Sequence, residues 1–148
     1  MASLRRRLAG PGRRREHGGV RPLHALVVGA GAVGGLCAAA LNAGGADVTV
    51  VSRSGGRSGE LRVHAWDEVP SEAVRRAEAV LVCVKAYATA EVADRLKAAG
   101  LPPGACVVSL QNGLGNEETL AAAGEGWAVV AGALTTAVRR EGGGAAAA

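Results

Sequence analysis

The sequence predicts an α/β fold of the Rossmann type, in which helices cover both faces of a doubly wound parallel sheet. Apolar runs with the length of strands alternate with helical patterns along most of the chain. Such alternation is typical of parallel strands joined by helical crossovers. In addition, the first apolar run leads directly into Gly29-x-Gly31-x-x-Gly34, and a helical pattern follows. A strand, a glycine turn and a helix in this order are typical of a dinucleotide-binding unit.

Each glycine of this turn has its own expected role. Gly29 would permit the tight turn, Gly31 would let the backbone approach a pyrophosphate, and Gly34 would let the helix pack closely on the strand. Ala32 and Val33 would then present free N–H groups to the anion, helped by the positive end of the helix dipole. Because the chain holds 23 glycines, the motif alone is a weak signal. A glycine-rich turn that binds nothing is the alternative.

The other elements follow from apolar periodicity and from helix start and stop signals. Strands are expected at 24–28, 47–52, 79–84, 105–110 and 129–135, with a short extended piece at 61–66; helices are expected at 33–43, 70–77 and 89–99, with another starting at 116. Ser71, Thr89 and Asn116 are predicted to cap helices with their side chains. Gly44 is predicted to end the first helix. Residues 54–59 are expected to form a polar loop.

Charge divides the chain into three expected parts. Residues 1–22 carry seven arginines and one glutamate, whereas the remainder has a charge of −2 within the net charge of +4. We expect residues 1–22 to be a disordered arm or an organelle transit peptide, residues 23–138 to form one domain, and residues 139–148 to be a low-complexity tail. The near-neutral body does not indicate a nucleic-acid partner. No apolar run reaches the roughly 20 residues that a membrane span needs.

The three cysteines indicate a reducing compartment and not a metal or redox site. Cys37, Cys83 and Cys106 lie inside apolar periodic segments, without a CxxC pair or clustered histidines. We expect buried, reduced thiols and no metal site. This pattern favours a cytoplasmic location. A mitochondrion or plastid is the alternative if the arginine-rich arm is a transit peptide.

Polar residues follow several of the predicted strands. In open α/β sheets, ligands bind outside the carboxyl ends of the strands. The glycine turn, Ser52 with Arg53, Lys85, and Gln111 with Asn112 would all lie there. Singly, a lysine after a strand often only reaches water, and Asn-Gly is often only a turn. Their shared position predicts a binding site at this edge of the sheet.

The residues after the second predicted strand bear on the choice of cofactor. Folds that prefer NAD usually place an acidic residue about 20 positions beyond the glycines, where it binds the ribose 2′-hydroxyl. Here Ser52, Arg53 and Ser54 stand at that position, and Asp47 is at the wrong end of the strand. Arg53, with Arg57 as a second candidate, would instead pair with a 2′-phosphate. The sequence therefore predicts NADP.

Two segments resemble blocks of the ketopantoate reductases (2-dehydropantoate 2-reductases). They are Leu-Val-Cys-Val-Lys-Ala-Tyr at 81–87 and Ser-Leu-Gln-Asn-Gly-Leu-Gly-Asn-Glu at 109–117; the glycine turn and Arg53 match as well. The resemblance covers about residues 23–138. It implies NADPH-dependent reduction of a 2-oxo acid, 2-dehydropantoate, to pantoate, a step toward pantothenate and coenzyme A.

The resemblance also implies roles for individual residues. Arg53 would meet the 2′-phosphate, Lys85 would contact the cofactor and the edge of the site, and Asn112 would lie on the nicotinamide side near the substrate. Lys85 and Asn112 are thus the candidate catalytic residues. The candidate cofactor-binding residues are Gly29, Gly31, Ala32, Val33, Gly34, Ser52, Arg53, Lys85 and Asn112.

The sequence departs from the family in two respects. Only 26 residues separate Ser52 from Ala79, where family members usually have a longer segment. The family's second, helical domain supplies a proton-donating lysine and most substrate contacts, and no residue here, Lys97 included, matches that lysine. We therefore expect the NADPH-binding half of a reductase, incomplete alone, with a separate chain carrying the helical domain as a partner. A non-enzymatic NADP(H)-binding module or a truncated gene product is the alternative.

Overall fold

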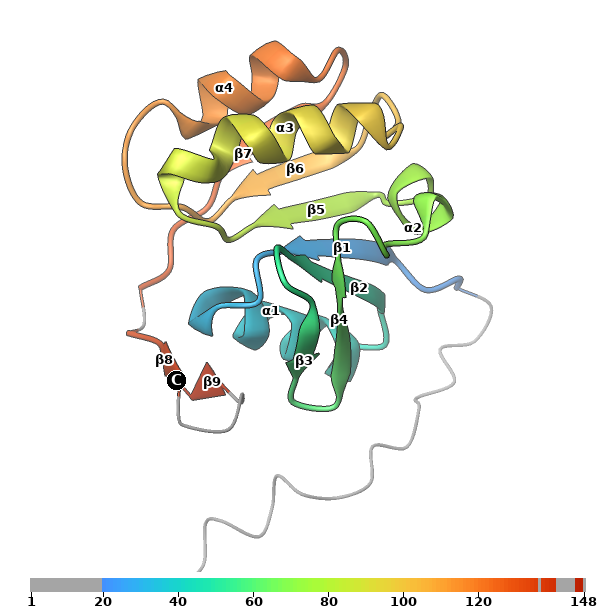
Figure 1. Cartoon of the computed structure of the whole chain (residues 1–148), viewed down its shortest axis with the longest axis vertical. Coiled ribbons are helices and arrows are strands. Elements are labelled where there is room, and N and C mark those ends of the chain that lie inside the picture. The colour runs from blue at the N-terminus through green and yellow to red at the C-terminus, as the bar shows by residue number, and fades with distance from the viewer. Residues whose placement is uncertain (1–19, 136, 141–145, 148) are drawn as a thin grey trace, which may run out of the picture.

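A seven-stranded sheet with the order β3-β4-β2-β1-β5-β6-β7 organises the molecule (Figure 1). The computed structural model describes residues 20–135, 137–140 and 146–147. The strands are β1 (His24–Val28), β2 (Asp47–Ser52), β3 (Gly56–Ser58), β4 (Leu61–Ala65), β5 (Ala79–Val82), β6 (Cys106–Ser109) and β7 (Ala128–Ala131). The helices are α1 (Ala32–Ala43), α2 (Ser71–Arg75), the short 3₁₀ helix η1 (Ala86–Ala88), α3 (Thr89–Ala98) and α4 (Asn116–Ala123).

The strand order confirms the predicted fold class. All neighbouring strands of the sheet are parallel except β3 and β4, which are antiparallel. With β3 set aside, the parallel strands follow the order 3-2-1-4-5-6 of dinucleotide-binding folds. The chain proceeds outward from β1 in one direction and then restarts at β5 on its other side. The point between β1 and β5 is therefore the topological switch point, where such folds bind ligands.

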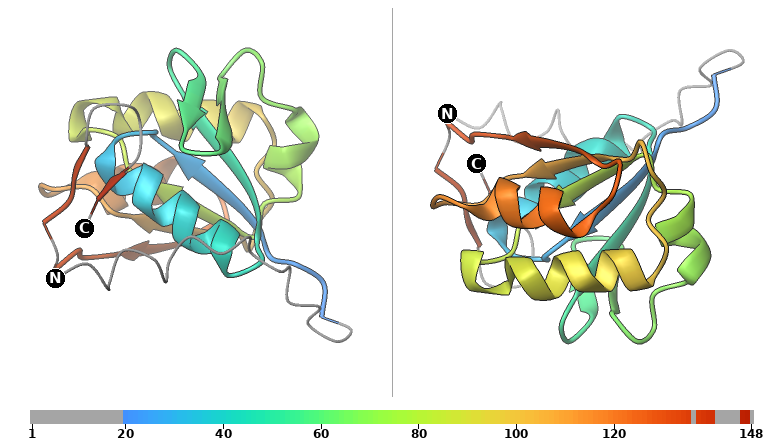
Figure 2. Two further views of the ribbon diagram at one scale, coloured as in Figure 1. Left: turned by 90° about the horizontal axis from the view of Figure 1, so that it is seen from below. Right: turned by 90° about the horizontal axis from the view of Figure 1, so that it is seen from above.

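Helices cover both faces of the sheet because successive strand residues point to opposite sides. Leu26 and Val28 of β1 pack into a core beneath α2, α3 and α4, whereas Val27 packs with Ala38 of α1 on the other face. Figure 2 shows α1 in front of the sheet in one view, and α3 and α4 in front in the opposite view. The central strands β1, β2 and β5 are rich in valine and largely buried on both faces, as expected of parallel strands, whereas the edge strand β7 is mostly exposed.

Residues 54–59 were expected to form a loop, and this expectation is wrong. Gly56–Ser58 form the edge strand β3, which pairs with β4 as an antiparallel hairpin. Gly59 makes the turn with φ +59°. The strand was not predictable from residue type, because glycine and polar residues disfavour strands and the pairing comes from β4.

Three predicted side-chain caps are also wrong. Pro70 is the N-cap of α2 instead of Ser71, and Ala88 is the N-cap of α3 instead of Thr89. For α4 the N-cap is Gly115, with φ +84°, instead of Asn116. Thr89 and Asn116 are the first residues of their helices, and their side chains bond to each other. Gly44 does occupy the C-cap position of α1.

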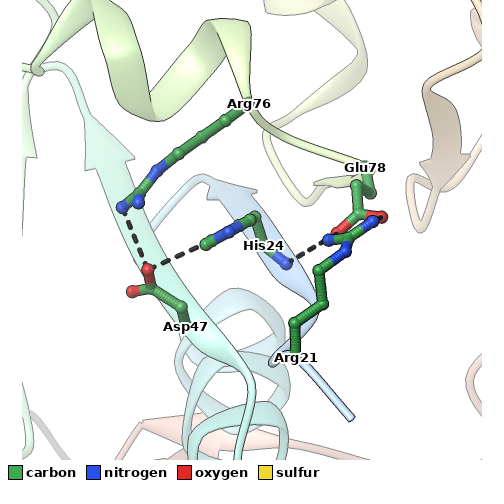
Figure 3. A network of polar contacts seen from close by, with 5 residues as sticks. All are labelled: Arg21, His24, Asp47, Arg76 and Glu78. Carbon is green, nitrogen blue, oxygen red and sulfur yellow. Dashed lines mark hydrogen bonds and ion pairs between the residues drawn. The ribbon is translucent and has the colours of Figure 1, made fainter. Parts of the chain in front are cut away.

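A polar network joins the starts of the strands, at the edge opposite the switch point (Figure 3). Asp47 accepts hydrogen bonds from Arg76 at 2.9 Å and from the His24 ring at 3.1 Å. Glu78 accepts two hydrogen bonds from Arg21 and one from the His24 backbone. Asp47 is thus occupied at the amino end of β2, far from any ribose bound at the carboxyl end.

The C-terminal segment forms a second, two-stranded sheet. Within the predicted tail, Arg139–Arg140 and Ala146–Ala147 form two short antiparallel strands, β8 and β9. Residues 1–19 of the predicted arm, and 141–145 and 148 of the tail, lie outside the described residues. In the described part of the chain, no helix is both long enough and apolar enough to cross a membrane.

Candidate functional site

A cavity of about 410 Å³ opens at the switch point. The ends of β1, β5 and β6 point to the same side of the molecule in Figure 1, and the segments that follow β1, β2 and β5 contribute to the cavity wall. The lining residues are Val28, Gly29, Ala30, Gly31, Ser52, Arg53, Ser54, Gly55, Arg57, Trp66, Cys83, Val84, Lys85, Tyr87, Ala88, Glu91 and Val92. The sheet edge expected from the sequence is therefore hollowed at the place where dinucleotide-binding folds hold their ligand.

Two glycines of the turn are fixed by contacts within the protein. Gly29 is buried with φ +105°, and a Cβ on it would lie 3.0 Å from the Cys83 carbonyl group. A Cβ on Gly34 would overlap the Gly29 carbonyl oxygen and lie 3.3 Å from Cys83 Cβ. Both positions need glycine for the strand, the turn and α1 to pack together.

Gly31 differs from the other two. It is exposed, has φ −72°, and a Cβ on it would meet nothing within 4 Å. Neither backbone conformation nor packing among the described residues requires glycine here. A group that comes close to the backbone from the cavity would require it. The start of α1, at Ala32 and Val33, follows Gly31 directly, and the first N–H groups of a helix are the backbone donors that an anion can use. The cradle therefore fits a pyrophosphate.

The cavity wall is positively charged. Arg53, Arg57 and Lys85 line it, and all three are exposed. Arg57 donates to the Glu60 carbonyl at 3.0 Å, whereas Arg53 and Lys85 have no side-chain partner among the described residues. Glu91 is the acidic residue in the lining, and Arg95 pairs with it at 3.0 Å. Such a wall is suited to phosphate groups. Arg53 follows the last residue of β2, as expected, and lines the cavity.

Asn112 and the helix residues Ala32, Val33 and Gly34 do not line this cavity. Asn112 is exposed on the loop that follows β6. Its backbone carbonyl accepts a hydrogen bond from Asn116 Nδ2 at 3.3 Å, so the loop is held in place while the Asn112 side chain faces solvent. The structure thus brings Gly29, Gly31, Ser52, Arg53 and Lys85 to one cavity, whereas Asn112 is not part of the lining.

Sequence reasoning missed two aromatic residues of the lining. Trp66 follows β4, and the Arg95 guanidinium lies 5.7 Å from the centre of its ring. Tyr87 lies in η1 and is 79% exposed. Tyr87 could have been found from its position, because it follows a predicted strand whose carboxyl end faces the site. Trp66 is the last residue of the extended piece expected at 61–66, and no such signal marked it.

The cysteines near the cavity are held as thiols. Cys37 on α1 is within hydrogen-bonding reach of Cys83, and burial raises the pKa of the Cys37 thiol. Burial, assisted by the neighbouring Cys37, raises the pKa of Cys83 to about 12. All three cysteines are free and only partly buried, so the expectation of buried thiols is met in part. The described residues include no group of three or more His, Cys, Asp or Glu side chains placed to hold a metal ion.

A comparison of the sequence with protein families decides the classification. The family model described as "Ketopantoate reductase PanE/ApbA" matches residues 25–147. The chain belongs to the ketopantoate reductase family. Ketopantoate reductases bind NAD(P)H, which agrees with the cavity at the switch point.

Individual relatives show how much of a ketopantoate reductase the chain spans. A 2-dehydropantoate 2-reductase of Archaeoglobus fulgidus is 39% identical over 108 residues, covering 64% of this chain and 34% of that protein. The ketopantoate reductase structure from Ralstonia eutropha is 30% identical with a TM-score of 0.59, covering 82% of this chain and 45% of that one. The structure of a 2-dehydropantoate 2-reductase from Geobacter metallireducens is 26% identical with a TM-score of 0.64 and the same coverage. The chain thus spans about a third to a half of these relatives.

Proposed function

We propose that this chain binds NADPH in the cavity at the switch point and is the cofactor-binding half of a ketopantoate reductase. One observation carries the proposal. A glycine whose Cβ position is empty, Gly31, lies in a cavity bordered by the cations Arg53 and Lys85, neither of which has a side-chain partner in the described structure. Such a wall favours a ligand with several phosphate groups.

Each candidate cofactor-binding residue has a proposed task in holding the dinucleotide. The turn at Gly29 and Gly31 and the first N–H groups of α1, from Ala32 and Val33, would bind the pyrophosphate, with Gly34 keeping the helix close. Ser52 and Arg53 would bind the ribose and its 2′-phosphate at the end of β2. Lys85 and Asn112, on the segments after β5 and β6, would lie toward the nicotinamide.

The proposed reaction is reduction of a 2-oxo acid, 2-dehydropantoate, for which bound NADPH supplies the hydride. The protein must hold the ketone beside the cofactor and give a proton to the developing alkoxide. We propose that a helical part like that of the family, on a separate chain, supplies the proton-donating lysine and most substrate contacts. Lys85 lines the cavity and is the first candidate proton donor only if the chain turns over alone.

Two measurements test this function. In calorimetric titration of the purified chain, NADPH is expected to bind more tightly than NADH, because the 2′-phosphate adds a charge-assisted contact. With NADPH and 2-dehydropantoate, oxidation followed by absorbance is expected to be at least a hundredfold below ordinary enzymatic rates, because loss of a general acid alone costs about 10²–10⁴-fold. Equal affinities would refute the NADPH assignment. Rapid turnover would show that residues of this chain suffice, with Lys85 as the first candidate acid. Binding without any turnover, even with a helical partner added, would favour the non-enzymatic module.

A further inference from the structure

A chain of hydrogen bonds, buried at its centre, connects the segment after β5 with the segment after β6. Gln111 Nε2 donates to the Val84 carbonyl at 3.1 Å and to Thr89 Oγ1 at 2.8 Å. Thr89 Oγ1 lies 2.8 Å from Asn116 Oδ1. Asn116 Nδ2 donates to the Asn112 and Gly113 carbonyls, both at 3.3 Å. Thr89 and Asn116 are each 3% exposed, so water cannot easily replace these bonds.

The Thr89 hydroxyl is the central link of this chain. Its oxygen accepts a hydrogen bond from Gln111 Nε2. Its own hydrogen has two possible acceptors, Asn116 Oδ1 and the Ala86 carbonyl oxygen, which are each 2.8 Å from Thr89 Oγ1. Both competitors are acceptors only. The Asn116 amide is buried and the segment that carries Ala86 is exposed, so water can serve Ala86 but not Asn116. The Thr89 hydroxyl therefore donates its hydrogen bond to Asn116 Oδ1.

The bonded groups flank both candidate catalytic residues. Lys85 stands between Val84, whose carbonyl is bonded, and Ala86, whose carbonyl lies beside Thr89. Asn112 stands between Gln111 and Gly113, and its own carbonyl is bonded as well. Lys85 and Asn112 are themselves exposed, so the buried network fixes the backbone from which they project.

We propose that Thr89 is a positioning residue, whose hydroxyl holds the segments of Lys85 and Asn112 in register at the nicotinamide end of the site. This inference rests on the proposed binding of NADPH. If Arg53 at the end of β2 binds the 2′-phosphate, the adenosine half lies on the β2 side of the switch point. The other half then extends toward β5 and β6, because dinucleotides lie across that point. Thr89 would influence the nicotinamide half and not the adenosine half.

The test compares NADPH with 2′-phosphoadenosine diphosphate ribose, which is NADPH without its nicotinamide. Thr89→Val keeps the shape of the side chain and removes the hydroxyl, and Thr89→Ser restores the hydroxyl. In calorimetric titration, Thr89→Val is expected to weaken NADPH binding about five- to tenfold, as for one lost hydrogen bond, and to leave the truncated ligand within twofold. Thr89→Ser is expected to bind both ligands as the unmodified chain does.

Thr119→Val is the matched control, because the Thr119 hydroxyl bonds to the Gly115 carbonyl on the same α4 end but outside the network. It should change neither affinity. Equal losses for the two ligands in Thr89→Val, no loss at all, or an equal loss in Thr89→Ser would overturn the proposal. If Thr89→Val does not fold, Gln111→Glu removes both Nε2 donors and must show the same selective loss. Failure of the unmodified chain to bind either ligand would instead refute the proposed function.

Discussion

A side chain on Gly34 would overlap the carbonyl oxygen of Gly29, so the first turn of α1 is packed directly against the glycine turn. Gly31, two residues from Gly29, has open space where its Cβ would be. Gly34 is therefore required by the fold, whereas in the proposed function Gly31 is required by the bound dinucleotide. Substitutions at the two positions separate these reasons.

Gly34→Ala is expected to destabilise the protein by about 1–3 kcal/mol, because its methyl group meets backbone that cannot move aside as a side chain would. Gly31→Val is expected to stay folded, with a melting temperature within a few degrees of that of the unmodified chain, and to lose NADPH binding. Thermal melting by circular dichroism and calorimetric titration measure the two effects. A folded Gly31→Val protein with normal affinity would show that the turn is only structural.

Arg53 provides the second prediction. Arg53→Ala is expected to weaken NADPH binding by about 1.5–3 kcal/mol, or ten- to a hundredfold, because it removes a charge-assisted contact with the 2′-phosphate. NADH binding should change little, since NADH lacks that phosphate. Arg62→Ala is the matched control: Arg62 is an exposed arginine of the neighbouring β4, paired with Glu68 at 3.6 Å, and is not in the cavity lining. A similar loss for both cofactors would mean that Arg53 acts through general charge.

The sequence predicted the fold well where the signal was local. The bounds of β1 and β2 agree with the expected ranges 24–28 and 47–52, because each is a continuous β-branched and apolar run between turn residues. The hairpin strand β3 escaped prediction because its pairing is supplied by β4 rather than by its own residues. The side chains of Thr89 and Asn116 escaped it too, because they use each other as partners instead of capping their helices.

The residues that line the cavity were predicted only in part. The edge of a parallel sheet can be located from the order of the elements, and Gly29, Gly31, Ser52, Arg53 and Lys85 do line one cavity at that edge. Which side chain enters that cavity depends on loop geometry, and so the exposed Asn112 and the lining residue Trp66 could not be assigned. The network around Thr89 depends on tertiary contacts over 22 and 27 positions of sequence, which no local pattern records.

Cys83 is expected to react slowly with alkylating agents. With a pKa near 12 instead of 9.0, its thiolate fraction at pH 8 falls about a thousandfold, and the greater nucleophilicity of a more basic thiolate recovers part of this. The net rate of the Cys83 reaction with iodoacetamide should be at least about 30-fold lower in the folded protein than in the same protein unfolded in urea. Mass spectrometry of the Cys83 peptide measures both rates. Equal rates in the two states would show that Cys83 is not held in an apolar contact.

Glu78 links the segment before β1 to β5 and provides a prediction about pH. Arg21 donates to both of its carboxylate oxygens, at 2.7 and 2.8 Å. Figure 3 shows the Arg21 side chain reaching the Glu78 carboxylate. These hydrogen bonds, with that from the His24 backbone, lower the pKa of Glu78 from 4.5 to about 2. A carboxyl group whose pKa is lower in the folded state stabilises that state fully above its ordinary pKa. Its contribution is lost as the pH falls from about 4.5 toward 2.

Melting temperatures of the unmodified chain and of Glu78→Gln, measured between pH 2 and pH 7, test this relationship. The unmodified chain is expected to melt at the higher temperature above pH 4.5, because only the carboxylate accepts both Arg21 bonds as an anion. The difference should shrink steadily below pH 4.5 and be mostly lost near pH 2, where the Glu78 carboxyl group is about half protonated in the folded protein. Glu125→Gln, at an exposed glutamate of the loop before β7, is the control for the loss of a surface carboxyl group and should leave the melting temperature close to that of the unmodified chain. If the gap between the Glu78→Gln and unmodified proteins is the same at pH 2.5 as at pH 6, the Arg21–Glu78 contact contributes through packing and not through charge.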